Sequence, residues 1–219
     1  MAAGGYLKTA DLPQVIPVFP LDGALLLPQG ALPLNIFEPR YLNMVDDAMA
    51  GDRIIGMIQT RGTNDPARPA LAAIGCTGRI TSFAETTDGR YLITLTGVCR
   101  FRVAAELPAP TPYRQVRADY AAFEDDLAEA VIEAGHDRER LLDALKAYLE
   151  RHRLALDWRM AREAPVESLI NSLSMALPFG PPAKQALLEA PSLADRLGML
   201  TTLLQIEAAA DDDGAPPMQ

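Results

Sequence analysis

The stretch Pro33–Tyr41, "PLNIFEPRY", joins a predicted strand to a predicted helix. Leu34 and Ile36 are two positions apart, so they lie on the same face of a strand. Pro39 is favoured in the first turn of a helix, and Glu38 places a negative charge at the positive end of the helix dipole. The stretch therefore predicts a strand–helix junction.

The helix predicted after this junction has one apolar face. Gly51 is a natural residue to end it. We expect Arg40 to make a structural ion pair or a backbone hydrogen bond that holds the helix on the neighbouring strands. The apolar residues recur at helical spacing: Tyr41, Met44, Val45, Ala48 and Met49.

Before residue 121, short apolar and β-branched runs alternate with Gly, Pro and Asp, which is typical of strands and turns. Asp88–Arg90, "DGR", predicts a hairpin turn, and Gly75 or Gly78 predicts a bend in the strand before it. Six to eight short strands indicate a small closed or nearly closed barrel. The predicted strands are Val15–Phe19, Ala24–Pro28, Leu32–Phe37, Arg53–Thr60, Ala72–Thr86, Tyr91–Gly97 with its continuation "VCRFRVAAE", and Tyr113–Tyr120.

The continuation after Gly97 shows period-two alternation. Phe101 lies between Arg100 and Arg102, which predicts one buried face and one solvent-exposed face carrying the arginines.

After residue 121 the apolar period becomes helical. A run of leucines predicts a helix that begins near Asp137. Two more helices are predicted to begin at prolines, one at Pro165 and one at residues 181 and 182. Ser192 with Asp195 forms a near capping box for a fourth helix. The predicted organisation is a flexible N-terminus over residues 1–12, a β-barrel over 13–120, a helical subdomain over 121–206 and a disordered acidic tail over 207–219.

The bulk composition excludes some classes of partner. The chain has 219 residues, is 49% hydrophobic, and carries 20 basic against 29 acidic residues for a formal charge of −9. This balance disfavours nucleic-acid binding, which depends on Lys and Arg at phosphates. No apolar run reaches the ~18 residues of a membrane span, and no secretory signal is recognisable, so we expect a cytoplasmic protein with no membrane partner. Cys76 and Cys99 leave two alternatives, a disulfide or buried free thiols, and a reducing compartment favours free thiols.

Sequence patterns for catalysis are missing. No serine lies in a G-x-S-x-G elbow, and Gly180–Lys184, "GPPAK", lacks the second glycine and the hydroxyl of a phosphate-binding loop. Glu124–Asp126 is better explained as a helix N-terminus than as a metal site. His136 and His152 are better explained as residues at helix ends. We therefore predict no catalytic residue, no metal and no cofactor.

The same stretch, extended to "PVFPLDGALLLPQGALPLNIFEPRY", is similar to the opening of the Lon protease N-terminal (substrate-binding) domain. Later blocks resemble the same family in the same order: "IGMIQTR", "AAIGCTGRI", "DGRYLITLTGVCRFRV", "YRQVRADY" and "KQALLEAPSLADRLGMLTTLL". The residues that carry the resemblance are Pro17, Pro20, Leu21, Pro28, Pro33, Leu34, Glu38, Pro39, Arg40, Gly97 and Arg100.

The resemblance implies an α+β fold, in which a PUA-like β pseudo-barrel with one inserted helix precedes a helical bundle. It also implies recognition of unfolded polypeptide segments or of a protein partner. The ATPase phosphate loop and the Ser–Lys peptidase of the full protease have no counterpart in this sequence, so the resemblance is to a stand-alone, non-enzymatic Lon domain.

Two hypotheses of function follow. The first is a polypeptide-binding module, an adaptor or a quality-control factor, because Met-rich surfaces adapt to varied partners. Its expected contact residues are Phe37, Tyr41, Met44, Met49 and Met57. The second is an enzyme or small-molecule-binding protein that uses a cleft between barrel and bundle, with Glu38 and Arg40 as its polar groups.

Overall fold

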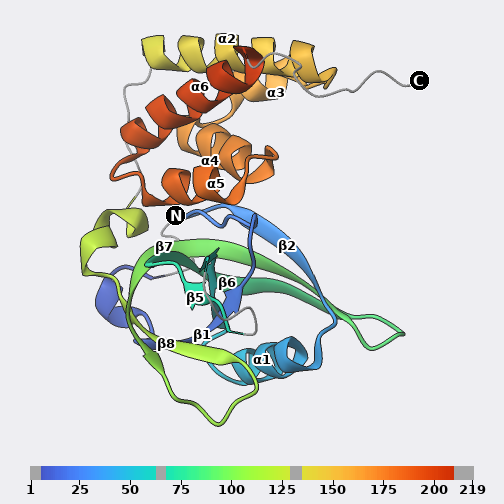
Figure 1. The fold of residues 1–219 in the computed structure, drawn as a ribbon, viewed down its shortest axis with the longest axis vertical. Helices are drawn as coiled ribbons and strands as arrows, with labels where there is room; N and C mark the ends of the chain where they lie inside the picture. The colour runs from blue at the N-terminus through green and yellow to red at the C-terminus, as the bar shows by residue number, and fades with distance from the viewer. Residues whose placement is uncertain (1–5, 63–67, 129–134, 210–219) are drawn as a thin grey trace. The chain divides into compact units, whose positions relative to one another are not determined.

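The computed structural model describes residues 6–62, 68–128 and 135–209 (Figure 1). The chain divides into two compact units. Unit 1 comprises residues 1–131 and 171–189, and unit 2 comprises residues 132–170 and 190–219. This division differs from the predicted boundary at residue 121, because a later helical segment belongs to the barrel unit. The Gln185 side chain shows why: its amide donates a hydrogen bond of 3.1 Å to the backbone oxygen of Ile74, a barrel residue.

Unit 1 is built on a six-stranded sheet, five strands of which close into a barrel. The strand order is β2-β7-β6-β3-β1-β8, and a further pairing of β7 with β8 closes the barrel, as predicted. β2 pairs with β7 and lies outside the closed ring. β1 and β3 are parallel, and the other neighbours are antiparallel. A separate two-stranded sheet joins β4 (Thr60–Arg61) to β5 (Ala70–Leu71). The strands of the large sheet are β1 (Val15–Pro20), β2 (Ala31–Ile36), β3 (Ile54–Ile58), β6 (Ile74–Glu85), β7 (Tyr91–Leu107) and β8 (Arg114–Asp119).

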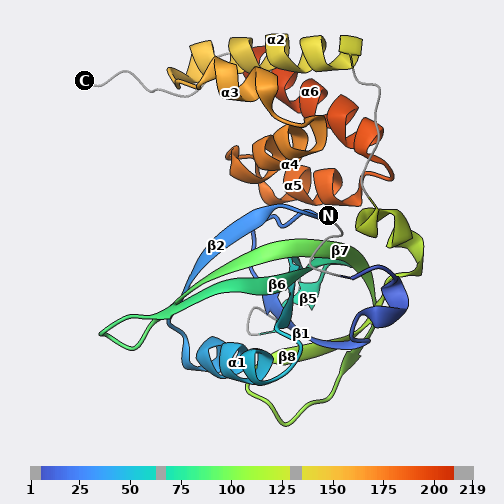
Figure 2. The ribbon, with the colours of Figure 1, turned by 180° about the vertical axis from the view of Figure 1, so that it is seen from behind.

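β6 and β7 form a long hairpin that extends beyond the rest of the barrel (Figures 1 and 2). Its turn is the predicted Asp-Gly turn, where Gly89 has a φ of 77° that suits glycine. The pairing register shifts between Thr77 and Gly78, which confirms a bend at the second of the two candidate glycines.

The predicted strand Ala24–Pro28 is wrong. Leu25, Leu26 and Leu27 are buried as a strand core would be, but the segment has no strand assignment. It instead passes close to Gly97 of β7, where a Cβ atom would overlap the carbonyl oxygen of Leu27. A buried segment that does not pair as a β-strand can have the same run of apolar residues as a buried strand. The run alone therefore does not distinguish the two.

Helix α1 (Pro39–Ala50) begins and ends where the sequence predicts. Pro39 occupies its first turn, and Gly51 follows its last residue. Tyr41, Met44, Val45 and Ala48 are buried, and the helix packs against β1. At the N-terminus of unit 1, a short 3₁₀ segment, η2 (Thr9–Asp11), precedes the buried Leu12.

Three helical segments complete unit 1. The acidic run predicted to open a helix lies in η3 (Ala121–Leu127), a 3₁₀ segment. Helix α4 (Val166–Ala176) contributes its second half, since the division between the units falls within it. α5 (Pro181–Glu189) begins at the prolines, as predicted, and contacts β6. The buried ammonium of Lys184 donates to the backbone oxygen of Met175 at 3.0 Å, near the end of α4.

Unit 2 consists of helices. α2 (Gly135–His152) packs against α6 (Leu193–Ala209) through Leu141, Leu145 and other buried residues. The predicted capping box is confirmed, because Asp195 N–H donates to the Ser192 hydroxyl and Ser192 N–H donates to the Asp195 carboxylate. The short α3 (Trp158–Glu163) was not predicted. α6 extends past the predicted end at residue 206, and the rest of the predicted tail lies outside the described residues.

Candidate functional site

The junction that opens the sequence analysis forms one wall of a pocket in unit 1. β2 ends at Ile36, Phe37 is exposed, and Glu38 is the residue before α1. The Glu38 carboxylate does not cap the helix. It accepts a hydrogen bond from Arg40 Nε at 2.9 Å and lies 2.8 Å from Arg40 Nη2. The expected ion pair of Arg40 therefore exists, but it links Arg40 to the start of its own helix and not to the strands.

Tyr41 holds this wall against β1. Its ring lies 4.2 Å from the ring of Phe19, measured between centroids, and the Arg40 guanidinium lies 4.6 Å from the Tyr41 centroid. Burial raises the pKa of the Tyr41 phenol. The buried ring thus gives Arg40 an apolar support at the pocket surface.

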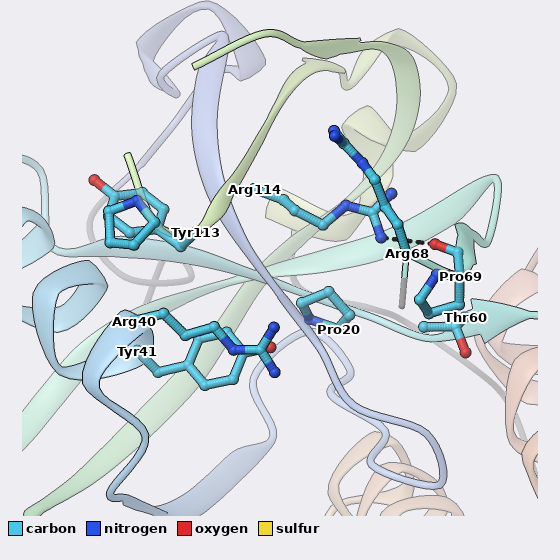
Figure 3. Close-up of a pocket in the computed structure, with 9 residues that line it drawn as sticks. Pro20, Arg40, Tyr41, Thr60, Arg68, Pro69, Tyr113 and Arg114 are labelled. Atoms are coloured by element: carbon cyan, nitrogen blue, oxygen red, sulfur yellow. Dashed lines mark hydrogen bonds between the residues drawn. The ribbon is translucent and has the colours of Figure 1, made fainter. Parts of the chain in front are cut away.

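The pocket has a volume of about 230 Å³ and combines arginines with proline and tyrosine rings (Figure 3). Arg40 of α1 and Arg114 of β8 extend toward the same space, with Pro20 of β1 beside them (Figure 3). Among the described residues, every charged residue that lines it is an arginine. The lining residues are Pro20, Arg40, Tyr41, Thr60, Arg68, Pro69, Pro112, Tyr113 and Arg114.

Arg114 is held rigidly by three hydrogen bonds. Its Nε and Nη2 donate to the two oxygens of Glu106 at 2.9 and 2.6 Å, and its Nη1 donates to the backbone oxygen of Pro69 at 2.7 Å. Arg68 also donates to Glu106. The hydrogen bond from Arg114, together with that from Arg68, lowers the pKa of the Glu106 carboxyl to about 2. Glu106 is therefore ionised near neutral pH and fixes the Arg114 guanidinium at the pocket wall.

Tyr113 connects β8 to α1 at the side of the pocket. Its hydroxyl donates to the Asp47 carboxylate at 2.6 Å. Burial and this hydrogen bond raise the pKa of Tyr113 to about 12. The contact places the start of β8, and with it Arg114, next to the helix that carries Arg40.

A second feature of unit 1 is a group of apolar side chains at the β6–β7 hairpin, which we call the hairpin apolar cluster: Phe37, Phe83, Tyr91 and Leu92. Phe37 is 61% exposed, Phe83 40% and Leu92 45%. The rings of Phe83 and Tyr91 meet edge to face at 5.0 Å. Tyr91 and Leu92 are adjacent in β7, so their side chains stand on opposite faces of the hairpin.

The five residues predicted to contact a partner do not share one exposed surface. Tyr41, Met44 and Met57 are buried, so their side chains belong to the core of unit 1. Their helical or strand spacing is the spacing of core residues. A recognition surface on a helix or strand has the same spacing, so the sequence pattern does not distinguish the two. Phe37 is exposed and Met49 is half-buried. Only Phe37 belongs to the hairpin apolar cluster.

The residues that carry the family resemblance are mostly structural. Pro17 and Pro20 lie in β1, and Leu21 is exposed directly after it. Pro33 is exposed and Leu34 half-buried in β2. The backbone oxygen of the buried Pro28 accepts a hydrogen bond of 3.0 Å from the Asn171 amide.

Arg100 corrects the predicted solvent-exposed face of β7. Its guanidinium is buried and pairs with the Asp126 carboxylate at 2.8 Å. It also donates to the backbone oxygen of Leu188 at 3.1 Å and lies 4.8 Å from the centroid of Phe123. Alternation holds at Arg102, which is exposed, but η3 and α5 cover the strand at Arg100. The sequence pattern of one strand contains no information about this cover.

The described residues contain no group of three or more His, Cys, Asp or Glu that could hold a metal ion. Cys76 and Cys99 are buried in the core and form no disulfide, and burial raises the pKa of Cys99, which disfavours a reactive thiolate. Glu38 and Arg40 pair with each other, and only Arg40 lines the pocket. This geometry supplies no acid–base pair for catalysis. No helix among the described residues is long and apolar enough to cross a membrane.

Sequence reasoning missed the other polar residues that line the pocket, and it missed Glu106, which pairs with Arg114 without lining the pocket. The missed lining residues are Thr60, Arg68, Tyr113 and Arg114. Arg114 is the second residue of the predicted strand Tyr113–Tyr120 and the first of β8. Nothing in the sequence around it indicated a pocket, because its neighbours there come from strand pairing. β8 pairs with both β1 and β7, which brings Arg114 opposite Val18 of β1 and within hydrogen-bond distance of Glu106 of β7.

Comparison with known proteins identifies similar sequences. Residues 15–205 match the model of the ATP-dependent protease La (LON) substrate-binding domain. Lon protease 2 of Myxococcus xanthus is 32% identical over 135 residues, which are 61% of this chain and 16% of that protein. The Lon protease of Dictyoglomus thermophilum is 26% identical over 172 residues, 78% of this chain and 20% of that protein. The chain thus spans only a small part of the length of these curated relatives.

Solved structures show the same fold. The crystal structure of a Lon N-terminal domain protein from Xanthomonas campestris matches with a TM-score of 0.61 and 24% identity, over 86% of this chain and 97% of that one. The N-terminal domain of the Mycobacterium avium complex Lon protease matches with a TM-score of 0.63 and 19% identity, over 90% of this chain and 99% of that one.

Proposed function

The chain belongs to the ATP-dependent protease La (LON) substrate-binding domain family, and on this premise we propose that it recognises polypeptide segments without catalysing a reaction on them. The observation that carries the proposal is the hairpin apolar cluster. Large apolar side chains that are exposed on a projecting hairpin, here on both of its faces, are typical of sites that bind other polypeptides. Membership of a substrate-binding family supports a polypeptide as the class of partner.

The hairpin offers two kinds of contact to an extended polypeptide. The aromatic rings of Phe37 and Phe83 provide rigid apolar anchors, a residue class enriched where binding energy concentrates. The second contact is the backbone of β6. β3 pairs with β6 only as far as Arg79, so no strand among the described residues pairs with the outer edge of Ser82–Glu85. An unpaired edge accepts an added strand through main-chain hydrogen bonds.

The finer role that we propose is that of an adaptor or a protein quality-control factor in the cytoplasm. The charge of −9 supports a partner other than nucleic acid. The absence of a disulfide between the buried Cys76 and Cys99 is consistent with a reducing compartment. The half-buried Met49 and the exposed Phe37 remain part of the proposed contact surface.

Fluorescence anisotropy with a labelled, permanently unfolded polypeptide tests the proposal. We expect the triple substitution Phe37→Ser, Phe83→Ser and Leu92→Ser to weaken binding by about tenfold or more, because it removes the exposed anchors. The matched control is Met160→Ser, which removes an apolar side chain that is 66% exposed in unit 2.

Two results would contradict the proposal. The first is binding of the unfolded polypeptide no stronger than that of an unrelated acidic protein of similar size. The second is equal weakening by the triple substitution and by Met160→Ser, which would show that the hairpin has no special part in binding. Circular dichroism of each variant checks that the fold is retained.

A further inference from the structure

The arginine-lined pocket is separate from the hairpin apolar cluster, and its residues suggest a ligand of definite charge. The chain has a formal charge of −9, yet the charged side chains that line the pocket in the described part of the chain are three arginines. They come from three places in the sequence: α1, the residues before β5, and β8. Such convergence of one sign of charge favours an anion.

Arg114 is oriented for recognition. Its three hydrogen bonds to Glu106 and Pro69 fix the plane of the guanidinium. A guanidinium has five N–H groups, so two remain after these bonds. Because its partner Glu106 keeps it in place, Arg114 loses little conformational freedom when a ligand binds.

Arg40 is available to exchange its partner. Its side chain is 52% exposed, and that of its partner Glu38 is 44% exposed. Ion pairs this exposed contribute little to stability, so replacing Glu38 by a ligand carboxylate costs little. The Tyr41 ring beneath the guanidinium keeps it over the pocket during such an exchange.

The remaining lining favours a single negative charge beside an apolar group. Pro20, Pro69 and the Tyr41 ring supply apolar surface next to the arginines. Among the described residues, four carboxylates pair with or accept hydrogen bonds from lining residues. Glu38 and Glu106 pair with arginines, Asp22 accepts from Thr60, and Asp47 accepts from Tyr113. Their repulsion disfavours a dianion such as phosphate more than a monoanion.

We propose that this pocket binds a carboxylate of a polypeptide, held between Arg40 and Arg114 with its apolar neighbour on the proline and tyrosine surface. The proposal rests on the proposed function, since it names the chemical group of the polypeptide that unit 1 recognises. A C-terminal carboxylate and the side chain of Asp or Glu present the same chemistry, and the experiment separates them.

Three labelled peptides of one apolar sequence provide the test. The first ends in a free carboxylate, the second in an amide, and the third in an amide preceded by a glutamate. We expect the first or the third to bind about tenfold more tightly than the second, as expected for hydrogen bonds to a charged group. Whichever of the two binds more tightly identifies the source of the carboxylate. The preference should decrease as salt is raised.

Arg40→Gln should abolish the preference and leave the fold intact, because its ion pair is exposed. The control Arg140→Gln removes the same charge from an exposed ion pair in unit 2 and should leave the preference unchanged. Equal binding of all three peptides, or a preference that survives Arg40→Gln, overturns the proposal. Competition by inorganic phosphate that is stronger than competition by acetate also overturns it.

The two proposals fail in different ways. If peptides bind without a carboxylate preference and the hairpin substitutions weaken them, the proposed function stands and the carboxylate site falls. If the preference exists and depends on Arg40 while the hairpin substitutions have no effect, the carboxylate site stands and the role of the hairpin falls. If none of the peptides binds, both fall.

Discussion

Replacing Arg100 by leucine tests the main polar interaction inside unit 1. The guanidinium joins β7 to η3 through Asp126 and to α5 through the backbone oxygen of Leu188. Both members of the ion pair are nearly inaccessible, with side-chain exposures of 6% and 8%. After the substitution the Asp126 carboxylate still accepts a hydrogen bond from the backbone N–H of residue 100, but it has lost the positive charge of its partner.

The expected cost follows from this burial. Removing one partner of a buried ion pair costs about 3–5 kcal/mol, because the remaining charge is neither solvated nor paired. A domain of this kind is stable by about 5–15 kcal/mol, so the loss is a large fraction of the total. The double substitution Arg100→Leu with Asp126→Leu removes both charges and should recover much of the loss, since well-packed apolar residues often replace a buried pair at little cost.

The change in the free energy of unfolding is measured by urea unfolding, with hydrogen exchange in peptides from β7 and α5 as the probe of unit 1. Fluorescence of Trp158, the single tryptophan, is a poor probe because it lies in α3 of unit 2. The control is Arg102→Leu, which removes an exposed arginine from the same strand. A loss for Arg100→Leu below about 1 kcal/mol, or one equal to that of Arg102→Leu, would refute the reasoning, because exposed pairs contribute that little.

Three further predictions concern other parts of the chain. Gly97→Ala should destabilise unit 1 severely in thermal unfolding, since its Cβ atom would overlap backbone at Leu27; an unchanged Tm would contradict the close approach. Ser192→Ala should lower the free energy of unfolding by about 0.5–2 kcal/mol, measured by urea unfolding with Trp158 fluorescence, because it removes the cap of α6. Thr202→Ala in the same helix should lower it less. The pKa of Glu106 is lowered from 4.5 to about 2, so its ionisation stabilises the fold fully above pH 4.5, and this contribution is lost as the pH falls through 2. In acid unfolding Glu106→Gln should lack this component, and an unchanged acid profile would argue against the Arg114 pair.

Local features of the structure could be predicted because their causes are local. Pro39 and Gly51 bound α1 through backbone preferences that act within a turn. Ser192 and Asp195 cap α6 by bonds between residues three positions apart. The Asp-Gly turn sets the β6–β7 hairpin in the same way. The number of short strands also indicated the closed barrel, and the family resemblance implied the α+β class.

The sites depended on the tertiary structure. Barrel closure brings Arg114 of β8 to Arg40 of α1, although no short-range pattern connects them. The cover over Arg100 comes from segments remote in the sequence, and this cover turns a predicted surface arginine into a buried one. Met44 and Met57 have the spacing of apolar residues on any helix or strand, and only packing decides that they are core. Sequence periodicity and local turn and cap residues thus predicted most of the elements, with Ala24–Pro28 and α3 as exceptions. Contacts between residues far apart in the chain decided which side chains meet, because side-chain environment depends on what packs against each element.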